Sequence, residues 1–291
     1  MARSTTPREI GQQDPLIWII GLAAGLGSAF LGMGGGLVLV PALTLILRRP
    51  ITQAIGTSLA VVLFISFAAV MADWELSGAR IQWTWTFVLG AGALIGSMLG
   101  VRLIGRIADN PLRLVLAGAL FAASIPAWTG WVGPKGPLVA PVVGSPAAER
   151  LLLLVVGFGA GLFTVLTGVG GGLATIPGLT LFVGGLPVDA IRATSLAAIV
   201  VAALIGAREH ALLGNVDRQL ATVLVPAGLT GAVLGVVSAA HFPTRVGELV
   251  FATLLVFAAA GLLAQVFYPS VVSGWSSPHG RHGRQAGANA P

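Results

Sequence analysis

The 291-residue chain contains no cysteine and few charged residues. Without cysteine there is no disulfide, no thiolate nucleophile and no cysteine-ligated metal. Charged residues make up only 9% of the chain and hydrophobic residues 56%, whereas a typical soluble domain is about 25% charged. Several apolar runs reach the roughly 20 residues that a helix needs to cross a bilayer. The composition therefore excludes an ordinary soluble domain and predicts a polytopic membrane protein.

Sequence signatures of catalysis are also missing. The chain has no cluster of His, Asp and Glu at metal-ligand spacing, no Gly-x-Ser-x-Gly and no Walker sequence, and Gly34-Gly35-Gly36 does not complete a dinucleotide-binding fingerprint. The net charge of +6 comes from arginines at the ends of apolar segments, as the positive-inside rule requires, and not from a basic block with interleaved aromatic residues. We therefore expect no enzyme, no metal, no cofactor and no nucleic-acid partner.

A glycine run that occurs twice is the clearest feature of the sequence. Gly32-Met33-Gly34-Gly35-Gly36-Leu37 returns 136 residues later as Gly168-Val169-Gly170-Gly171-Gly172-Leu173. Over 32–45 and 168–181 the two copies share nine of fourteen residues. Downstream, Thr57-Ser58 matches Thr194-Ser195 after one inserted residue. The chain is therefore an internal duplication.

The glycine run interrupts the first apolar stretch, residues 16–47. As one helix this stretch would be about 48 Å long, against a hydrocarbon core of about 30 Å, so it is too long for one crossing and too short for two. We predict two half-helices, 16–31 and 36–47, which meet at the glycines as a broken or re-entrant helix. A second broken stretch is expected at 150–183. Single apolar segments are predicted at 51–71, 84–105, 111–131, 188–207, 219–240 and 246–267.

The predicted fold is an all-α integral membrane protein with eight hydrophobic segments in two homologous, inverted four-segment repeats. We expect five regions: a polar N-terminal tail (1–15), repeat 1 (16–131), a Gly/Pro-rich linker (132–149), repeat 2 (150–267) and a disordered C-terminal tail (268–291). If the glycine stretches re-enter, eleven of the 16 Lys and Arg residues lie on the inner side; with eight plain crossings nine do. The count favours re-entrant hairpins, and both arrangements place the two termini in the cytoplasm.

The triple glycines predict an anion site. A half-helix that begins inside the membrane has up to four N–H groups without an intrahelical partner, and the positive end of its dipole lies there. Gly34, Gly35 and Gly36, with Gly170, Gly171 and Gly172, occupy these positions in the two copies. The alternative is close helix packing through small residues. We assign that packing role to other pairs, Gly21/Gly25, Gly96/Gly100, Gly157/Gly161 and Gly231/Gly235.

Two hydroxyl pairs are further candidates for binding the anion. Thr57 and Ser58, like Thr194 and Ser195, lie about two turns into the segment after each broken stretch. Their hydroxyls can donate to an oxyanion or bond back to the carbonyl of residue i−4 in their own helix, and the sequence leaves both open. Because they occur in both copies, we rank them above single residues such as Ser28.

Arg192 is the ionisable residue nearest to these pairs, three residues before Ser195. It could attract an anion, but Ile55 occupies the matching position of the first repeat. We therefore expect its side chain to snorkel to the membrane interface. His210 lies at a segment end, the usual place for a titratable residue.

These motifs together resemble the sulfite exporter TauE/SafE family of membrane transporters. The resemblance rests on Gly25-Leu26, the first glycine run, Pro41 and Thr57-Ser58-Leu59, and on the repetition of this pattern from Gly161 to Leu196. It implies a duplicated helical transporter of the inner membrane that moves small sulfur-containing anions such as sulfite or organosulfonates, often outward.

We therefore expect a secondary transporter that exports a small anion, sulfite or an organosulfonate, across the inner membrane. Its partners are that anion and the lipid bilayer. The alternatives are an uncoupled anion channel and a non-transporting membrane scaffold. The sequence leaves the coupling ion, the identity of the anion and homo-oligomerisation open.

Overall fold

The protein is described from a computed structural model that covers residues 15–77, 81–103, 106, 108–129, 145–179, 188–239 and 244–267. The predicted polar tail before residue 15, most of the predicted linker and the predicted C-terminal tail lie outside the described residues. Within the described ranges the chain forms helices and no strand. This confirms the prediction of an all-α protein.

The first half of the chain begins with a helix that is interrupted at the glycine run. α1 (Pro15–Leu31) ends one residue before the run, and α2 (Gly36–Pro41) begins on its last glycine. Pro41 has no N–H to donate and its ring crowds the carbonyl one turn earlier. The helix widens directly after it into a π-helical turn, η1 (Ala42–Ile46), which ends with a bond from Leu47 N–H to Ala42 O at 3.0 Å. The following elements are α3 (Ile51–Ala72), a π-helical turn η2 (Asp73–Ser77), α4 (Trp83–Leu103) and α5 (Asp109–Thr129).

The second half has the same order of α-helices. Ser145 caps its first helix, because its side chain accepts from Ala148 N–H at 3.3 Å. The elements are α6 (Pro146–Thr167), α7 (Gly172–Gly178), α8 (Val188–Leu212), α9 (Arg218–Ala239) and α10 (Thr244–Phe267). The interruption between α6 and α7 again falls on a glycine run.

Several helices are suited to a membrane. Among the described residues, five are long and apolar enough to cross it, namely α3, α4, α6, α8 and α9. Large apolar side chains such as Phe87, Phe121 and Phe257 lie exposed on the outside of the bundle, where lipid replaces water. The chain is therefore a multi-pass membrane protein.

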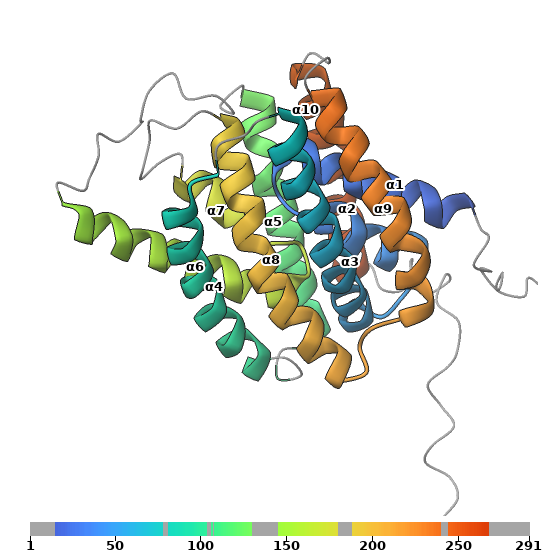
Figure 1. Cartoon of the computed structure of the whole chain (residues 1–291). Helices are drawn as coiled ribbons and strands as arrows, with labels where there is room; N and C mark the ends of the chain where they lie inside the picture. The colour runs from blue at the N-terminus through green and yellow to red at the C-terminus, as the bar shows by residue number, and fades with distance from the viewer. Residues whose placement is uncertain are drawn as a thin grey trace, which may run out of the picture.

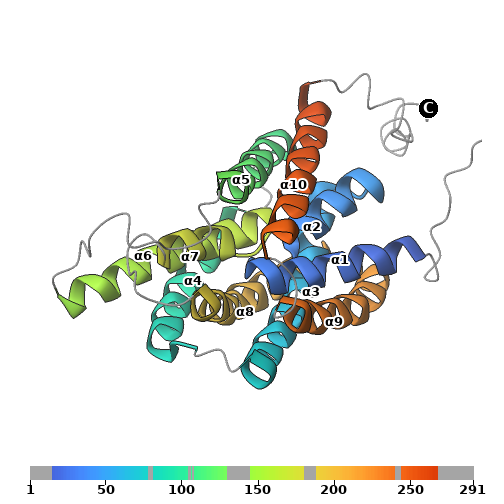
Figure 2. The same cartoon turned by 90° about the horizontal axis from the view of Figure 1, so that it is seen from above.

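The packing contacts of the first half have counterparts in the second. α1 packs against α9 and α6 against α4, while α3 and α8 pack against each other in the middle. Figures 1 and 2 show α4 and α6 on one side of the α3–α8 pair and α1 and α9 on the other, with α5 beside α10. α3 and α8 run antiparallel, because Gly56 near the start of α3 contacts His210 near the end of α8. Each half thus packs its first helix against a late helix of the other half.

Small residues allow these helices to approach closely. A Cβ placed on Gly25 would lie 2.1 Å from the carbonyl oxygen of Gly228 in α9, and one on Gly231 would lie 2.2 Å from that of Leu22 in α1. A Cβ on Gly161 would lie 2.1 Å from the carbonyl oxygen of Ala93, which places the same contact between α6 and α4. The remaining glycines assigned to packing, Gly21, Gly96, Gly100, Gly157 and Gly235, lie in the same two interfaces. The predicted packing role of these four pairs is confirmed.

Candidate functional site

Each glycine run forms a tight turn between a long helix and a short one. In the first turn, Gly32, Gly34 and Gly35 have φ angles of 67°, 85° and 72°. In the second turn, Gly168 and Gly170 have φ angles of 70° and 94°. Side chains of L-residues rarely adopt this left-handed region, so glycine is needed at these positions for conformation alone.

The two turns touch each other. A Cβ on Gly36 would lie 2.2 Å from the carbonyl oxygen of Gly168, and one on Gly172 would lie 2.4 Å from the Cα of Met33. A Cβ on Gly170 would lie 2.6 Å from the carbonyl oxygen of Met33. Backbone therefore packs on backbone, and any side chain at these glycines would separate the two turns.

This junction lies at mid-length of the two central helices. The Cβ position of Gly34 is 3.3 Å from Val62 Cγ1 of α3 and 3.3 Å from Ile199 Cγ2 of α8. Val62 and Ile199 correspond to each other in the repeat, and each is the twelfth residue of its helix. In helices that cross a bilayer, mid-length corresponds to the middle of the hydrocarbon core.

The serines of the two hydroxyl pairs connect the halves. Ser58 Oγ donates to the carbonyl oxygen of Gly168 at 2.8 Å, and Ser195 Oγ donates to that of Gly32 at 3.2 Å. Ser195 Oγ also shares a short hydrogen bond with the hydroxyl of Thr175. Each serine therefore holds the glycine turn of the opposite half.

The threonines of the same pairs hold the starts of two other helices. Thr57 Oγ1 accepts from the backbone N–H of Asp217, just before α9, at 2.9 Å. Thr194 Oγ1 accepts from the backbone N–H of Gln82, just before α4, at 3.2 Å. Thus all four hydroxyls make hydrogen bonds to distant parts of the protein, which the sequence pattern alone did not indicate.

Arg192 forms a buried ion pair with Asp73, contrary to the expectation that it snorkels to the interface. Arg192 Nη2 donates to Asp73 Oδ1 at 2.6 Å, and the two side chains are 15% and 0% exposed. The pair joins α8 to the end of α3. The stem of Arg192 passes beside the first glycine turn, since a Cβ on Gly32 would lie 2.5 Å from Arg192 Cγ. The expectation was wrong because the carboxylate that pairs with Arg192 comes from the other half of the chain.

His210 occupies the position of the second half that corresponds to Asp73, 137 residues earlier. It is 2% exposed. Its Nε2 lies 3.2 Å from the carbonyl oxygen of Val165, and its Nδ1 lies 3.4 Å from the amide nitrogen of Asn215. Asp73 was not predicted from the sequence, although the spacing that aligns Thr57 with Thr194 also aligns Asp73 with a second titratable residue, His210.

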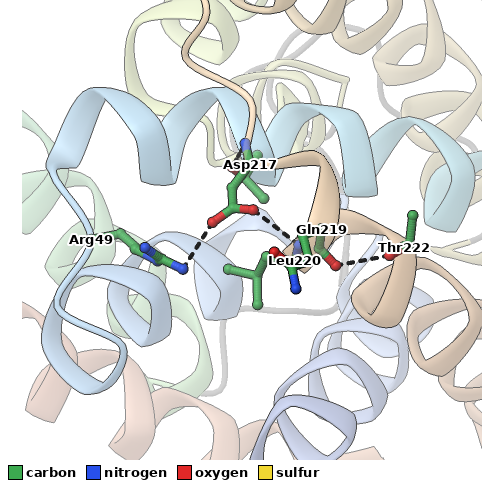
Figure 3. A network of polar contacts seen from close by, with 6 residues as sticks. Arg49, Asp217, Gln219, Leu220 and Thr222 are labelled. Atoms are coloured by element: carbon green, nitrogen blue, oxygen red, sulfur yellow. Dashed lines mark hydrogen bonds and ion pairs between the residues drawn. The ribbon is translucent and has the colours of Figure 1, made fainter. Parts of the chain in front are cut away.

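A second ion pair joins the starts of α3 and α9. Arg49 Nη2 lies 2.9 Å from Asp217 Oδ2. The other carboxylate oxygen of Asp217 accepts from Leu220 N–H at 3.0 Å and so caps the first turn of α9. Figure 3 shows Asp217 between Arg49 and this turn. The residues just before the two helices therefore lie at the same end of the bundle.

The structure thus brings together the six glycines that were predicted to form the anion site. Gly34–Gly36 and Gly170–Gly172 form one junction, and the serines of the two pairs bond to its carbonyl groups. The described residues contain no group of three or more His, Asp and Glu side chains that could hold a metal ion.

A multi-pass bundle with two interrupted helices meeting at mid-length has the architecture of a membrane transporter. The model of the family described as Sulfite exporter TauE/SafE matches residues 1–127 and 153–288. The chain therefore belongs to this family, as the resemblance of its motifs indicated.

Similar proteins are named as transporters too. The chain is 28% identical over 242 residues to a probable membrane transporter protein, YunE, of Bacillus subtilis, with 76% of this chain and 86% of that protein covered. It is 27% identical over 233 residues to a probable membrane transporter protein of Xylella fastidiosa, with 77% and 82% covered. A shorter match, 32% identical over 110 residues, covers 38% of this chain and 44% of another B. subtilis protein, YdhB, which carries the same description.

Proposed function

We propose that this membrane transporter is a secondary transporter that exports a small sulfur-containing anion, sulfite or an organosulfonate, across the inner membrane. The observation that carries the proposal is the contact between the two glycine turns at mid-length of α3 and α8. A substrate held there is reachable from either side by small movements of the surrounding helices, as alternating access requires.

The chemistry of the junction suits an anion. α2 begins at Gly36 and α7 at Gly172, so the positive ends of two short helices lie there. In α2 the first intrahelical donors are Val38 and Leu39, both of which bond to the carbonyl oxygen of Gly35. The N–H groups of Gly36 and Leu37 precede them and suit an oxyanion.

Two ion pairs support the re-entrant arrangement of inverted repeats. With re-entrant glycine stretches, Arg49 and Asp217 lie on one side of the membrane, and Asp73 and Arg192 lie together on the other. With eight plain crossings, each pair would have its members on opposite sides, yet the pairs measure 2.9 Å and 2.6 Å. We therefore propose re-entrant repeats, with both termini in the cytoplasm.

The hydroxyl pairs Thr57-Ser58 and Thr194-Ser195 stay predicted members of the site. In the structure their bonds run to the protein. An oxyanion only accepts hydrogen bonds, so a hydroxyl binds it by donating its proton. Ser58 and Ser195 donate theirs to glycine carbonyls and would have to exchange those bonds, whereas Thr57 and Thr194 are acceptors in the bonds described.

Uptake into proteoliposomes tests the proposed function. Purified full-length protein is reconstituted, and labelled sulfite and methanesulfonate are offered with and without a pH gradient. A transporter gives saturable uptake that competes between anions, whereas a channel gives conductance without saturation. The absence of any uptake or binding would favour the scaffold alternative and refute the proposal.

A further inference from the structure

Two buried serines lie next to the first glycine turn. Ser28 in α1 and Ser66 in α3 are both 0% exposed. Neither Oγ has a hydrogen-bond partner among the residues that the structure describes. A buried hydroxyl without a partner has lost its bonds to water and gained none in exchange, which costs free energy. Such groups in a native structure call for an explanation.

Both serines face consecutive glycines of one turn. Ser66 Oγ lies 3.4 Å from the Cβ position of Gly34, and Ser28 Cβ lies 3.5 Å from that of Gly35. The two serines come from different helices, and the glycines between them carry no side chain. The two serines therefore flank the same short stretch of buried backbone just before the start of α2.

Neighbouring hydroxyls in the same junction are bonded within the protein. Thr164, the repeat counterpart of Ser28, donates to the carbonyl oxygen of Ala160 at 2.6 Å. Ser58 and Ser195 donate to glycine carbonyls of the opposite half. A serine in a helix can in general bond to the carbonyl of residue i−4, but Ser28 Oγ makes no such bond. Its lack of a partner therefore sets it apart from Thr164.

The arrangement occurs in one half only. The repeat counterpart of Ser66 is Ala203, which has no hydroxyl. The second glycine turn therefore has neither an unpartnered Ser28 equivalent nor a hydroxyl in place of Ser66.

We propose that Ser28 and Ser66 are the hydroxyls that hold the transported anion, at a site formed by Gly34 and Gly35 in the first turn. This inference rests on the proposed function. The O–H groups donate to two oxygens of a small oxyanion, while backbone N–H groups at the start of α2 donate to another. Donors from α1, α2 and α3 converge on a group that can only accept hydrogen bonds, which is the chemistry of a sulfite or sulfonate head group. In this arrangement the hydroxyl pairs at 57–58 and 194–195 border the site and shape the junction through their bonds to the protein, while Ser28 and Ser66 supply the two unpaired side-chain donors.

Binding of sulfite to purified full-length variants tests the assignment. Ser28→Ala and Ser66→Ala each delete one donor and leave the backbone unchanged, so the dissociation constant for sulfite should rise at least tenfold in each. The thermal stability without ligand should stay the same or increase, because each change removes an unpaired buried polar group. A purely structural role for the serines would lower the stability instead.

Two variants serve as matched controls. Thr164→Val deletes the hydroxyl at the counterpart position, where it donates to a carbonyl of its own helix. Because a hydroxyl with an intrahelical acceptor adds little to binding, the sulfite affinity should stay within about twofold of the parent. Ser28→Thr keeps a hydroxyl and should retain more affinity than Ser28→Ala.

The possible outcomes distinguish a failure of the serine assignment from a failure of the proposed transport function. If the parent binds sulfite and both alanine variants bind it equally well, the serine assignment is wrong and the transport proposal stands. If the parent binds neither sulfite nor methanesulfonate, both are overturned.

Discussion

The two central glycines, Gly35 and Gly171, match in sequence but should respond differently to the same substitution. Gly35 has a φ of 72°, and a Cβ there would lie 2.7 Å from the carbonyl oxygen of Ala24. Gly171 has a φ of −73° and a ψ of −10°, and a Cβ there would meet Thr164 Oγ1 at 3.1 Å and Ala160 Cβ at 3.2 Å. Gly35→Ala is therefore strained by both conformation and contact, whereas Gly171→Ala is only tightly packed.

The expected changes in the free energy of unfolding follow from the backbone conformation and from the contacts of the added Cβ. An alanine in the left-handed region costs roughly 1–2 kcal/mol, and overpacking against a fixed backbone atom costs roughly 1–3 kcal/mol more. Gly35→Ala should therefore destabilise the fold by about 2–5 kcal/mol. Gly171→Ala gains about 0.4–1 kcal/mol from the reduced entropy of the unfolded chain, which its tight side-chain contacts offset, so its net effect should be small.

Melting temperature and sulfite affinity should be measured together for both variants. Gly159→Ala is the control for stability, because a Cβ there meets nothing within 4 Å. If the second turn touches the anion, Gly171→Ala should weaken binding while the melting temperature hardly changes. Equal losses of stability in the two variants would refute the reasoning from backbone geometry. Lower stability with unchanged affinity in Gly35→Ala would assign that glycine to packing and contradict the anion site at the first turn.

Three further predictions concern the contacts between the halves. Thr57→Val and Thr194→Val each remove the acceptor of a backbone N–H and should lower stability by about 0.5–1.5 kcal/mol; unchanged sulfite affinity in both would exclude direct binding to these hydroxyls. Asp73→Asn breaks the buried ion pair and leaves the charge of Arg192 unpaired, which should cost about 3–5 kcal/mol in thermal unfolding. Adding Arg192→Gln should recover part of this loss, and no recovery would show that the two side chains act independently. A single cysteine at Arg49 should react with an impermeant reagent only from the cytoplasmic side, and labelling from outside would contradict the re-entrant arrangement.

The helices could be predicted because the sequence features that specify them, apolar runs and glycine runs, are local. A run of apolar residues sets the length of each span, and the expected segments 51–71 and 219–240 differ from α3 and α9 by a residue or two. The interruptions fall on the glycine runs for an equally local reason, since glycine is a poor helix former that readily adopts positive φ.

The contacts that define the site were not predictable, because they join residues far apart in the chain. Ser58 and Gly168 are 110 residues apart, and Arg192 and Asp73 are 119 apart. Periodicity and spacing show which residues repeat, but they do not show which acceptor lies opposite a hydroxyl. Ser28 was therefore placed below the paired hydroxyls as a candidate. In the structure the pairs bond to the protein, and Ser28 Oγ has no partner among the described residues.

The duplication explains both the symmetry of the junction and where that symmetry fails. Backbone contacts repeat in the two halves because both copies keep their glycines and their hydroxyl pairs. Polar side chains near the first turn do not repeat: Ser66 corresponds to Ala203 and Arg192 to Ile55. The two halves of a symmetric scaffold need to share only their backbone contacts. The small anion proposed as the substrate would occupy one position and need one set of hydrogen-bond donors. The positions where the copies differ in hydrogen-bonding capacity are therefore better guides to the substrate than the positions where they agree.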